Sequence, residues 1–304
     1  MPIKQVTDQL MRRIPAARLK QNEPMKHYTS FKIGGPADIL VFPASLAEIQ
    51  LVAATCRQFA VPLTIIGRGS NLLVRDKGIR GVVIKLDGNL AYIKREGAHV
   101  VAGAGVFLKD LAEQTAAWGL AGFEFAVGIP GTLGGAIVMN AGAYTGEIKD
   151  VVGRVTVIDK AGDIHNFSRG KMEFGYRSSP FQTGEYIVAE AELCLTTDEP
   201  EAILARIKDM TTRRESRQPL EYPSAGSTFK RPPGYFAGTL IEQTGLKGLR
   251  HGGAQVSEKH AGFIVNAGGA TAADVLALIK EVQRRVKETF NVALHPEVRV
   301  IGEE

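Results

Sequence analysis

GIPGTLGGAIVMNAGAY, residues 128–144, contains five glycines, one proline and no charged side chain. The uncharged stretch runs from Phe125 to Gly146, which is about the 20 residues that a transmembrane helix needs. The glycines and Pro130 break a helix in the first half, so the stretch predicts a loop followed by a short element. Glycines at this density indicate either a backbone that approaches a ligand such as a phosphate or a chain packed tightly on itself. Both interpretations remain open at this point.

The composition indicates a soluble globular protein. The chain has 304 residues, 44% hydrophobic and 23% charged, which is enough for two or three domains. No apolar signal region follows the N-terminus, which predicts a cytoplasmic protein without a membrane partner. The net charge of +5 and pI near 9.1 suit a polyanion. Because the basic residues are dispersed, apart from Arg-Arg pairs such as 213–214, we expect a small anionic ligand and no nucleic acid.

The two cysteines predict neither a disulfide nor a metal site. Cys56 and Cys194 are far apart in the chain, lie in apolar segments and match no metal or redox spacing. We therefore expect both to be reduced core residues of a cytosolic protein, and we expect no metal.

Strand and helix patterns alternate along the chain. A helix is predicted after a capping box of Ser45 and Glu48, and a hairpin at 154–168 turns between Lys160 and Asp163. Further strands are predicted at 38–42, 62–67, 81–86, 100–106, 186–195, 261–268 and 297–302. Further helices are predicted from Leu108 to Gly119, from Pro200 to about Arg217, at 238–245 and from Thr271. A domain boundary is expected near 210–220.

A second glycine-rich segment, GRGSN at 67–71, follows a predicted strand directly. It lacks the third glycine of a Rossmann fingerprint, and the chain has no Walker A sequence. Two glycine loops, at 67–71 and 128–135, can present backbone N–H groups to a pyrophosphate without a lysine. A β-turn closed by Ser70 and Asn71 explains the first loop equally well.

Six motifs in this order resemble the family of UDP-N-acetylmuramate dehydrogenases, also called UDP-N-acetylenolpyruvoylglucosamine reductases (MurB). The resemblance covers roughly residues 28–302 and is to the shorter type, which lacks an inserted loop with a tyrosine. The motifs are IGRGSNLL (66–73), GIPGTLGGAIVMNAGAY (128–144), GYRSSPF (175–181), AGSTFKRP (225–232), GGAQVSEKHAGFIVN (252–266) and HPEVRVIG (295–302).

The resemblance implies an α+β protein with the FAD-binding fold of the vanillyl-alcohol-oxidase (PCMH) type. The FAD-binding domain would span 1–215, with subdomains of about 1–80 and 81–215. An α+β substrate-binding domain would span 216–304, and its final strand, 297–302, would return to the active site. The glycine-rich residues 128–144 would then lie against the flavin.

The resemblance also implies an FAD-dependent oxidoreductase of cytoplasmic peptidoglycan synthesis, and so of cell wall biogenesis, cell shape, the cell cycle and cell division. NADPH would reduce the flavin and leave, and the enolpyruvyl ether of UDP-N-acetylglucosamine would enter the same pocket and be reduced to UDP-N-acetylmuramate. We expect the FAD to be non-covalent, because the first glycine loop has no histidine or cysteine, and we expect a monomer.

Three chemical roles are needed to reduce an enolpyruvyl ether: a cation at the carboxylate, a proton donor and a group that steadies the developing charge. The family motifs assign these to Arg177, Ser227 and Glu297. From the residues alone, the spacing does not exclude that Arg177 is a loop arginine paired with an acid on the surface. Glu297 could equally form a strand-edge salt bridge, and an ordinary turn or cap serine is the favoured interpretation of Ser227.

The remaining site residues also follow from the resemblance. Arg231 stands where asparagine is common in the family, so the groups that hold the diphosphate are open. The expected FAD contacts are Gly67, Arg68, Gly69, Ser70, Asn71, Ile129, Gly131, Thr132, Gly135, Asn140, Gly142, Ala143 and Arg299. The candidate substrate contacts are Lys230, Arg231, Tyr235 and Lys259.

Two other classes of protein fit parts of the sequence. A flavin oxidase of the same fold, acting on another small hydroxyl or amine substrate, would lack the joint set of Arg177, Ser227 and Glu297. A non-enzymatic nucleotide- or RNA-binding protein is suggested by the pI alone, and it would carry no chromophore.

Overall fold

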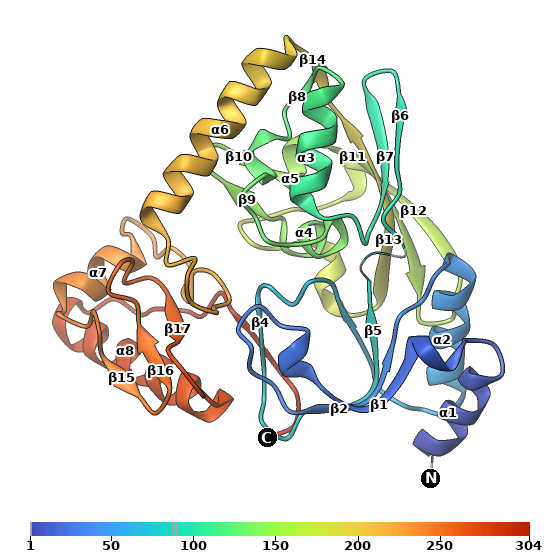
Figure 1. Ribbon diagram of the computed structural model, residues 1–304, viewed down its shortest axis with the longest axis horizontal. Helices are drawn as coiled ribbons and strands as arrows, with labels where there is room; N and C mark the ends of the chain where they lie inside the picture. The colour runs from blue at the N-terminus through green and yellow to red at the C-terminus, as the bar shows by residue number, and fades with distance from the viewer. Residues whose placement is uncertain (1, 87, 89) are drawn as a thin grey trace. The chain divides into compact units, whose positions relative to one another are not determined.

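The computed structural model describes residues 2–86, 88 and 90–304 and forms two compact units (Figure 1). The first unit comprises Met1–Gln21, Asp38–Arg68 and Gly81–Arg214, and the second comprises Asn22–Ala37, Gly69–Arg80 and Glu215–Glu304. The C-terminal boundary, between 214 and 215, lies in the region where the sequence predicts one. The second unit also takes in 22–37 and 69–80, which the sequence analysis placed in an FAD-binding domain. The functions assigned to the two domains stay predictions.

The first unit contains a five-stranded antiparallel sheet in the order β12-β11-β13-β7-β6. Its strands are β6 (Ile93–Glu96), β7 (His99–Gly103), β11 (Val152–Asp159), β12 (Ile164–Ser168) and β13 (Tyr186–Cys194). The predicted hairpin at 154–168 is confirmed, with the N–H of Asp159 donating to the carbonyl of Asp163. Cys194 is not a core residue as predicted, because the alternation along β13 buries its neighbours Leu193 and Leu195 and leaves the thiol partly exposed.

A four-stranded sheet, β1-β2-β5-β3, packs with the first two helices. Its strands are β1 (Leu19–Pro24), β2 (Pro36–Val41), β3 (Leu63–Ile66) and β5 (Ile79–Lys85), and the helices are α1 (Pro2–Met11) and α2 (Leu46–Gln58). The hydroxyl of Ser45 caps α2 by accepting from the Glu48 N–H at 3.3 Å. The predicted reciprocal bond is replaced, because the Glu48 carboxylate accepts from the Ala44 N–H and pairs with Arg18, which lowers its pKa.

The glycine-rich stretch at 128–144 is a loop followed by a short helix, as predicted. The helix, α4 (Leu133–Met139), ends at Asn140, whose backbone is left-handed at φ 42°. Strand pairs and helices complete the first unit: α3 (Leu108–Ala117), β8 (Leu120–Ala121), β9 (Gly142–Ala143), β10 (Gly146–Glu147), α5 (Ile148–Val151), β14 (Thr196–Thr197) and most of α6 (Pro200–Arg217), with β8 paired to β14 and β9 to β10.

The second unit has its own hydrophobic core, built mainly around α8 (Ala272–Phe290). Thr271 and Asp274 form a capping box at the start of α8, so the helix predicted from Thr271 is confirmed. The other elements are β4 (Leu72–Val74), α7 (Ala237–Gln243), β15 (Arg250–His251), β16 (Ala254–Val256), β17 (Ile264–Asn266) and β18 (Arg299–Ile301). Strand β18 pairs in parallel with β4, joining the C-terminal segment to residues that follow the first glycine loop.

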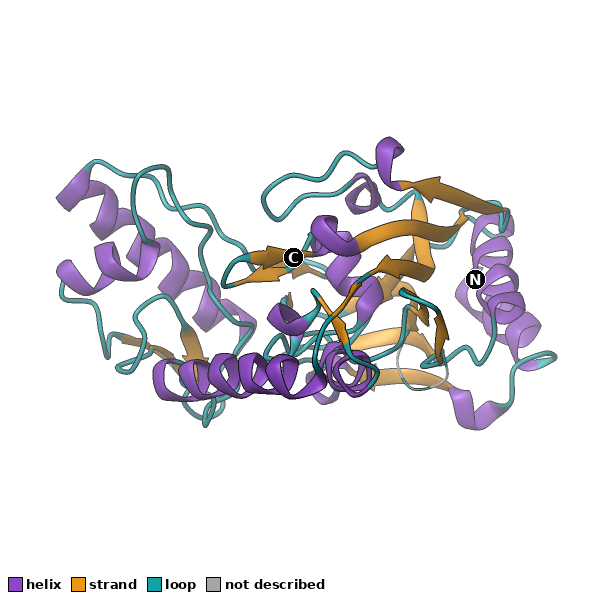
Figure 2. Ribbon diagram, turned by 90° about the horizontal axis from the view of Figure 1, so that it is seen from above, coloured by secondary structure: helices purple, strands orange, loops and turns teal. Residues whose placement is uncertain are grey.

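Both units combine helices with largely antiparallel strand pairs, in keeping with an α+β protein (Figure 2). None of the helices within the described residues has the length and hydropathy needed to cross a lipid bilayer.

Candidate active site

The first glycine loop meets the second at Gly67 and Thr132. A Cβ atom at Gly67 would lie 2.2 Å from the Thr132 hydroxyl oxygen, so any other residue there would displace that hydroxyl. The carbonyl of Gly67 accepts from the buried ammonium of Lys85 at 2.9 Å, and the guanidinium of Arg68 lies 4.8 Å from the ring centroid of Phe107. Gly67, at the start of the first loop, is therefore a neighbour of the second loop within the first unit.

The hydroxyl of Thr132 is buried and has no hydrogen-bond partner among the described residues. The residue is 1% exposed and lies just ahead of α4, where its carbonyl accepts from the Ala136 N–H. Because a buried hydroxyl without a partner costs about 1 to 3 kcal/mol, it is a place where a ligand acceptor would be stabilising.

The second loop is bound along its length to residues 104–108, which precede and begin α3. The N–H of Leu108 donates to the Gly131 carbonyl at 3.0 Å, and the Gly134 N–H donates to the Ala104 carbonyl at 2.9 Å. A Cβ atom at Gly134 would lie 2.8 Å from the Cβ of Ala104. At Gly134 the glycine therefore serves close packing of the chain on itself, which is one of the two interpretations left open by the sequence.

Arg177 lies at the tip of a tight loop closed by two hydrogen bonds between Gly175 and Ser178. Its backbone is left-handed, at φ 51°, which is uncommon for a residue with a side chain. Its guanidinium donates to the Gly142 carbonyl at 2.8 Å, so the arginine head lies at β9. A strained backbone that the surrounding structure holds in place is typical of functional loops.

Asn140 holds the Arg177 loop in place. It is fully buried, and its amide donates to the Gly175 carbonyl at 2.8 Å and to the Glu147 carboxylate at 3.1 Å. Its side-chain oxygen accepts from the Lys149 N–H at 3.0 Å. The Asn140 side chain, predicted as an FAD contact, thus joins three segments of the protein around Arg177.

Ser227 and Glu297 are brought together in the second unit. Ser227 is exposed and follows Gly226, which has a left-handed backbone. The next residue, Thr228, is buried, and its carbonyl accepts from the Glu297 N–H at 2.8 Å. The serine hydroxyl is thus carried on a loop fixed by its neighbour.

Further contacts fix the backbone on both sides of Ser227. The Thr228 N–H donates to the Gly262 carbonyl at 2.8 Å, and the Thr228 hydroxyl accepts from the Ile264 N–H at 2.9 Å. The Gly262 N–H donates to the ring Nδ1 of His260, whose pKa is lowered by burial. The neutral imidazole that burial favours is the form that accepts this hydrogen bond.

The segment that carries Glu297 is anchored on the first glycine loop. The Asn71 amide donates to the Glu297 carbonyl at 3.2 Å, and the Arg299 N–H donates to the Asn71 carbonyl at 2.9 Å. Asn71, a predicted FAD contact, therefore positions the backbone of two other predicted residues. The predicted common face of Glu297 and Arg299 falls partly outside the strand, because β18 begins at Arg299.

Three of the four candidate substrate residues share one loop of the second unit. The guanidinium of Arg231 lies 4.0 Å from the ring centroid of Phe236, and Tyr235 is half-exposed beside it. Lys230 is held in the same loop by its N–H bond to the His295 carbonyl. Lys259 lies elsewhere, and its ammonium donates to the Glu215 carbonyl at 2.8 Å.

Arg214 is a candidate that the sequence analysis did not assign. A Cβ atom at Gly128 would lie 2.7 Å from the Cδ of Arg214, so the arginine stem packs on the second glycine loop. Burial lowers the pKa of its guanidinium, and no carboxylate pairs with it among the described residues. In the sequence, Arg214 stands out only as part of the Arg-Arg pair at 213–214. Its contact with Gly128 is visible only in the structure.

The chain matches two family models and is similar to solved structures. Residues 37–168 match the model described as FAD binding domain, and residues 218–301 match the model described as UDP-N-acetylenolpyruvoylglucosamine reductase, C-terminal domain. The crystal structure of UDP-N-acetylenolpyruvylglucosamine reductase (MurB) from Thermus caldophilus is similar, with a TM-score of 0.79 and 39% identity over 93% of this chain and 97% of that one. An alkyldihydroxyacetonephosphate synthase structure, at 15% identity and a TM-score of 0.51 over 64% of this chain and 40% of that one, shares the fold alone.

Curated relatives match the chain over nearly its whole length. The UDP-N-acetylenolpyruvoylglucosamine reductase of Syntrophomonas wolfei is 52% identical over 96% of this chain and 97% of its own. That of Clostridium botulinum is 54% identical over 93% of this chain and 92% of its own. That of Caldanaerobacter subterraneus is 52% identical over 98% of both.

The fold and the two glycine loops define an FAD-dependent oxidoreductase with the FAD-binding fold of the vanillyl-alcohol-oxidase type. The relatives make the assignment narrower: the chain belongs to the UDP-N-acetylenolpyruvoylglucosamine reductase family. The resemblance to this family is thus confirmed, and a non-enzymatic RNA-binding protein is excluded. The partnerless Thr132 hydroxyl fits FAD, because it gives the cofactor a buried hydrogen-bond donor.

Proposed function

We propose that the chain reduces the enolpyruvyl ether of UDP-N-acetylglucosamine to UDP-N-acetylmuramate, with NADPH as the reductant and non-covalent FAD as the carrier. The enzyme acts as a monomer in the cytoplasm, in the synthesis of peptidoglycan precursors. The observation that carries this proposal is the 52% to 54% identity, along nearly the whole chain, to relatives named for this reduction. An oxidase acting on another small substrate is not favoured by that observation.

Bound FAD would supply hydride transfer, with NADPH as the source of the hydride and the methylene carbon of the enolpyruvyl group as its destination. Negative charge then develops on the substrate carboxylate and on the adjacent carbon, and the protein must stabilise it. The planar guanidinium of Arg177 is suited to hold the carboxylate through two hydrogen bonds. Ser227 donates the proton that the carbon takes up, and Glu297 orients the groups around it.

The contacts of the described residues support these roles. Asn140 fixes the loop of Arg177, and Thr228 fixes the backbone beside Ser227 and Glu297. Both anchoring side chains are buried and hydrogen-bonded to other parts of the protein, which is how a protein holds catalytic groups at a defined place. We propose that Asn140 and Thr228 are positioning residues and that Arg177, Ser227 and Glu297 are the catalytic ones.

The phosphate groups of FAD and of the UDP-sugar are anionic, and cations and N–H donors stabilise them. We propose that Thr132 and the glycines of the two loops contact FAD and that Arg214 contributes a positive charge to an anionic group beside Gly128. Lys230 and Arg231, together with Tyr235 in the same loop, are proposed to hold the UDP diphosphate, with Lys259 as a further candidate.

The purified protein tests this proposal through its colour. We expect a yellow protein that NADPH bleaches, that recovers its colour on addition of the enolpyruvyl sugar nucleotide, and that releases its flavin on denaturation. UDP-N-acetylglucosamine is the control, because it has the same nucleotide but no enolpyruvyl group. Recovery of colour with the control, or flavin that stays with the unfolded chain, would contradict the proposal.

Thr132→Val tests the FAD contact. Valine has nearly the same shape but no hydroxyl, so we expect the flavin-free protein to be as stable as the wild type or more stable, since a partnerless buried donor is removed. FAD affinity should fall by roughly tenfold or more, because a hydrogen bond to a charged ligand contributes about 1.5 to 3 kcal/mol. Fluorescence titration of flavin-free protein and thermal unfolding measure the two quantities.

Thr115→Val is a matched control for this experiment. Thr115 is buried to the same extent, but its hydroxyl already donates to the Ala112 carbonyl at 3.0 Å. We therefore expect the control to lower stability and to leave the FAD affinity unchanged. An unchanged FAD affinity in Thr132→Val would remove Thr132 from the cofactor site.

A further inference from the structure

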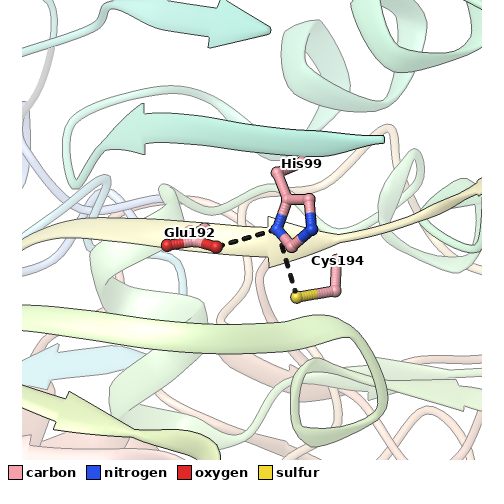
Figure 3. A group of neighbouring side chains, drawn as sticks. All are labelled: His99, Glu192 and Cys194. Carbon is pink, nitrogen blue, oxygen red and sulfur yellow. Dashed lines mark hydrogen bonds and ion pairs between the residues drawn. The ribbon is translucent and has the colours of Figure 1, made fainter. Parts of the chain in front are cut away.

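We propose that His99, Glu192 and Cys194 form a binding site for a divalent transition metal, preferentially zinc, on the five-stranded sheet. The three residues lie on two adjacent strands, His99 on β7 and the other two on β13 (Figure 3). One potential ligand atom from each lies within 4.8 Å of those of the other two. None of them belongs to the site proposed for FAD or for the sugar nucleotide.

The register of the sheet produces this cluster. His99 and Cys194 are directly opposite each other across the antiparallel pair, so their side chains lie on the same face. Glu192 is two residues before Cys194 on β13 and therefore shares that face. Nearly one hundred residues separate His99 from Cys194 in the chain, which is why the spacing of the cysteines gave no metal motif.

The ligand types and distances suit zinc. Imidazole, thiolate and carboxylate are the donors that zinc takes in proteins, at about 2.0 to 2.3 Å in tetrahedral geometry, which puts ligand atoms about 3.3 to 3.6 Å apart. The His99 Nδ1 atom lies 3.7 Å from the Cys194 sulfur and 2.8 Å from a Glu192 oxygen. Zinc would replace the hydrogen bond between His99 and Glu192, with a small outward movement of the carboxylate. Cys194 would bind as the thiolate and release its proton to solvent.

Two residues of β11, Gly153 and Arg154, lie beside the cluster and affect its ability to bind a metal. A β-bulge at Gly153 on β11 brings a residue without a side chain beneath the thiol, since a Cβ atom there would lie 2.6 Å from the Cys194 sulfur. The second oxygen of Glu192 is paired with Arg154 at 3.0 Å. Such a contact outside the metal's ligands orients a carboxylate and leaves its other oxygen, which faces His99, available to the metal. The arginine charge opposes a cation, so the thiolate and carboxylate are both needed to balance it.

A further acidic residue lies in register with the three, although its carboxylate is not within 4.8 Å of all of their ligand atoms. Glu96 is exposed and lies directly opposite His99 on β6, so its side chain is on the same face of the sheet. His99 is half-exposed, which leaves the metal open to solvent on one side. The fourth position is therefore taken by Glu96 or by water, as in zinc sites with three protein ligands.

Metal titration of the FAD-loaded protein tests the site, with Co²⁺ as the spectroscopic probe and Zn²⁺ as the competitor. We expect one Co²⁺ per chain, a thiolate-to-cobalt absorption band in the difference spectrum, and loss of this band when Zn²⁺ is added. Cys194→Ser and His99→Gln should each weaken Zn²⁺ binding by more than the roughly 10- to 100-fold that loss of an outer contact costs. FAD content shows whether each variant is folded.

His165→Gln is the matched control, because His165 forms the same imidazole–carboxylate pair with Asp159, at 2.8 Å, without a cysteine. It should bind both metals as the wild type does. Thiol labelling gives a test without any variant: Zn²⁺ should slow the labelling of Cys194, the only thiol of the two that is not buried. Absence of stoichiometric binding, no protection by Zn²⁺, or an undiminished cobalt band in His99→Gln, which would mean binding by the thiol alone, would each overturn the proposal.

Discussion

Ser227→Ala is expected to abolish most of the substrate-dependent recovery of the yellow colour while leaving the NADPH-dependent bleaching nearly unchanged. The two halves of the reaction differ in what they need from the protein, because only the second places a proton on a substrate carbon. A positioned proton donor contributes roughly 10²- to 10⁴-fold to a rate, so the second half should slow by that order. The Ser227 side chain is exposed and the fold around it is held by Thr228, so its removal should leave stability unchanged.

Stopped-flow absorbance of the two half-reactions measures this difference. Ser227→Cys is the matching variant, since a thiol can give up a proton from nearly the same place, and it should restore part of the second half. Equal losses in the two halves would show that Ser227 is a structural turn residue, and the proton donor would then have to be another group.

Local sequence signals predicted the elements whose structure depends on neighbours in the chain. The helix α6 starts at Pro200 and ends at Arg217 as its pattern indicated, and Thr271 caps α8 through a hydrogen bond three residues away. The strand pair of β4 and β18 could not be foreseen, because β4 is only three residues long and its partner lies more than two hundred residues later. Pairings between such distant segments determine which parts of the chain make up the second unit.

In the candidate site, too, the sequence predicted individual residues but not the contacts between distant segments. Motif resemblance pointed to Arg177, Ser227 and Glu297, but the residues that fix them emerge only from the fold. Asn140 was predicted as a cofactor contact, which stays a prediction, and only the structure shows its three hydrogen bonds to two other segments of the protein. The cluster of His99 with Cys194 depends on strand register, which the separate strand patterns do not determine.

Asn140→Gly is expected to lower both stability and activity by a large amount, although glycine accepts the left-handed backbone that Asn140 has. The substitution removes the Asn140 side chain from the Gly175 carbonyl and the Lys149 N–H, and also from the Glu147 carboxylate, which keeps its ion pair with Lys149 at 2.9 Å. Each buried group left unsatisfied costs about 1 to 3 kcal/mol, so the loss from the Gly175 carbonyl and the Lys149 N–H together should be about 2 kcal/mol or more. Urea unfolding measures it.

Asn291→Gly is the control for the backbone effect. Asn291 ends α8 with φ 56°, just as Asn140 ends α4 with φ 42°, but Asn291 is exposed. Because glycine suits a left-handed helix end, this control should change stability by only a few tenths of a kcal/mol. A small loss in both variants would mean that the amide of Asn140 contributes little.

The effect of Asn140→Gly on the reaction separates positioning from stability. If Asn140 acts by holding the Arg177 loop, the variant at a temperature where it is fully folded should bind the enolpyruvyl substrate weakly and recover its colour slowly, yet still be bleached by NADPH. Arg177→Lys should give the same pattern, because an ammonium cannot replace the two-pronged contact of a guanidinium with a carboxylate. In the double variant the two effects should be much less than additive, since both act on the same carboxylate contact. Full additivity would place Asn140 and Arg177 in independent roles and would refute the link through Gly175.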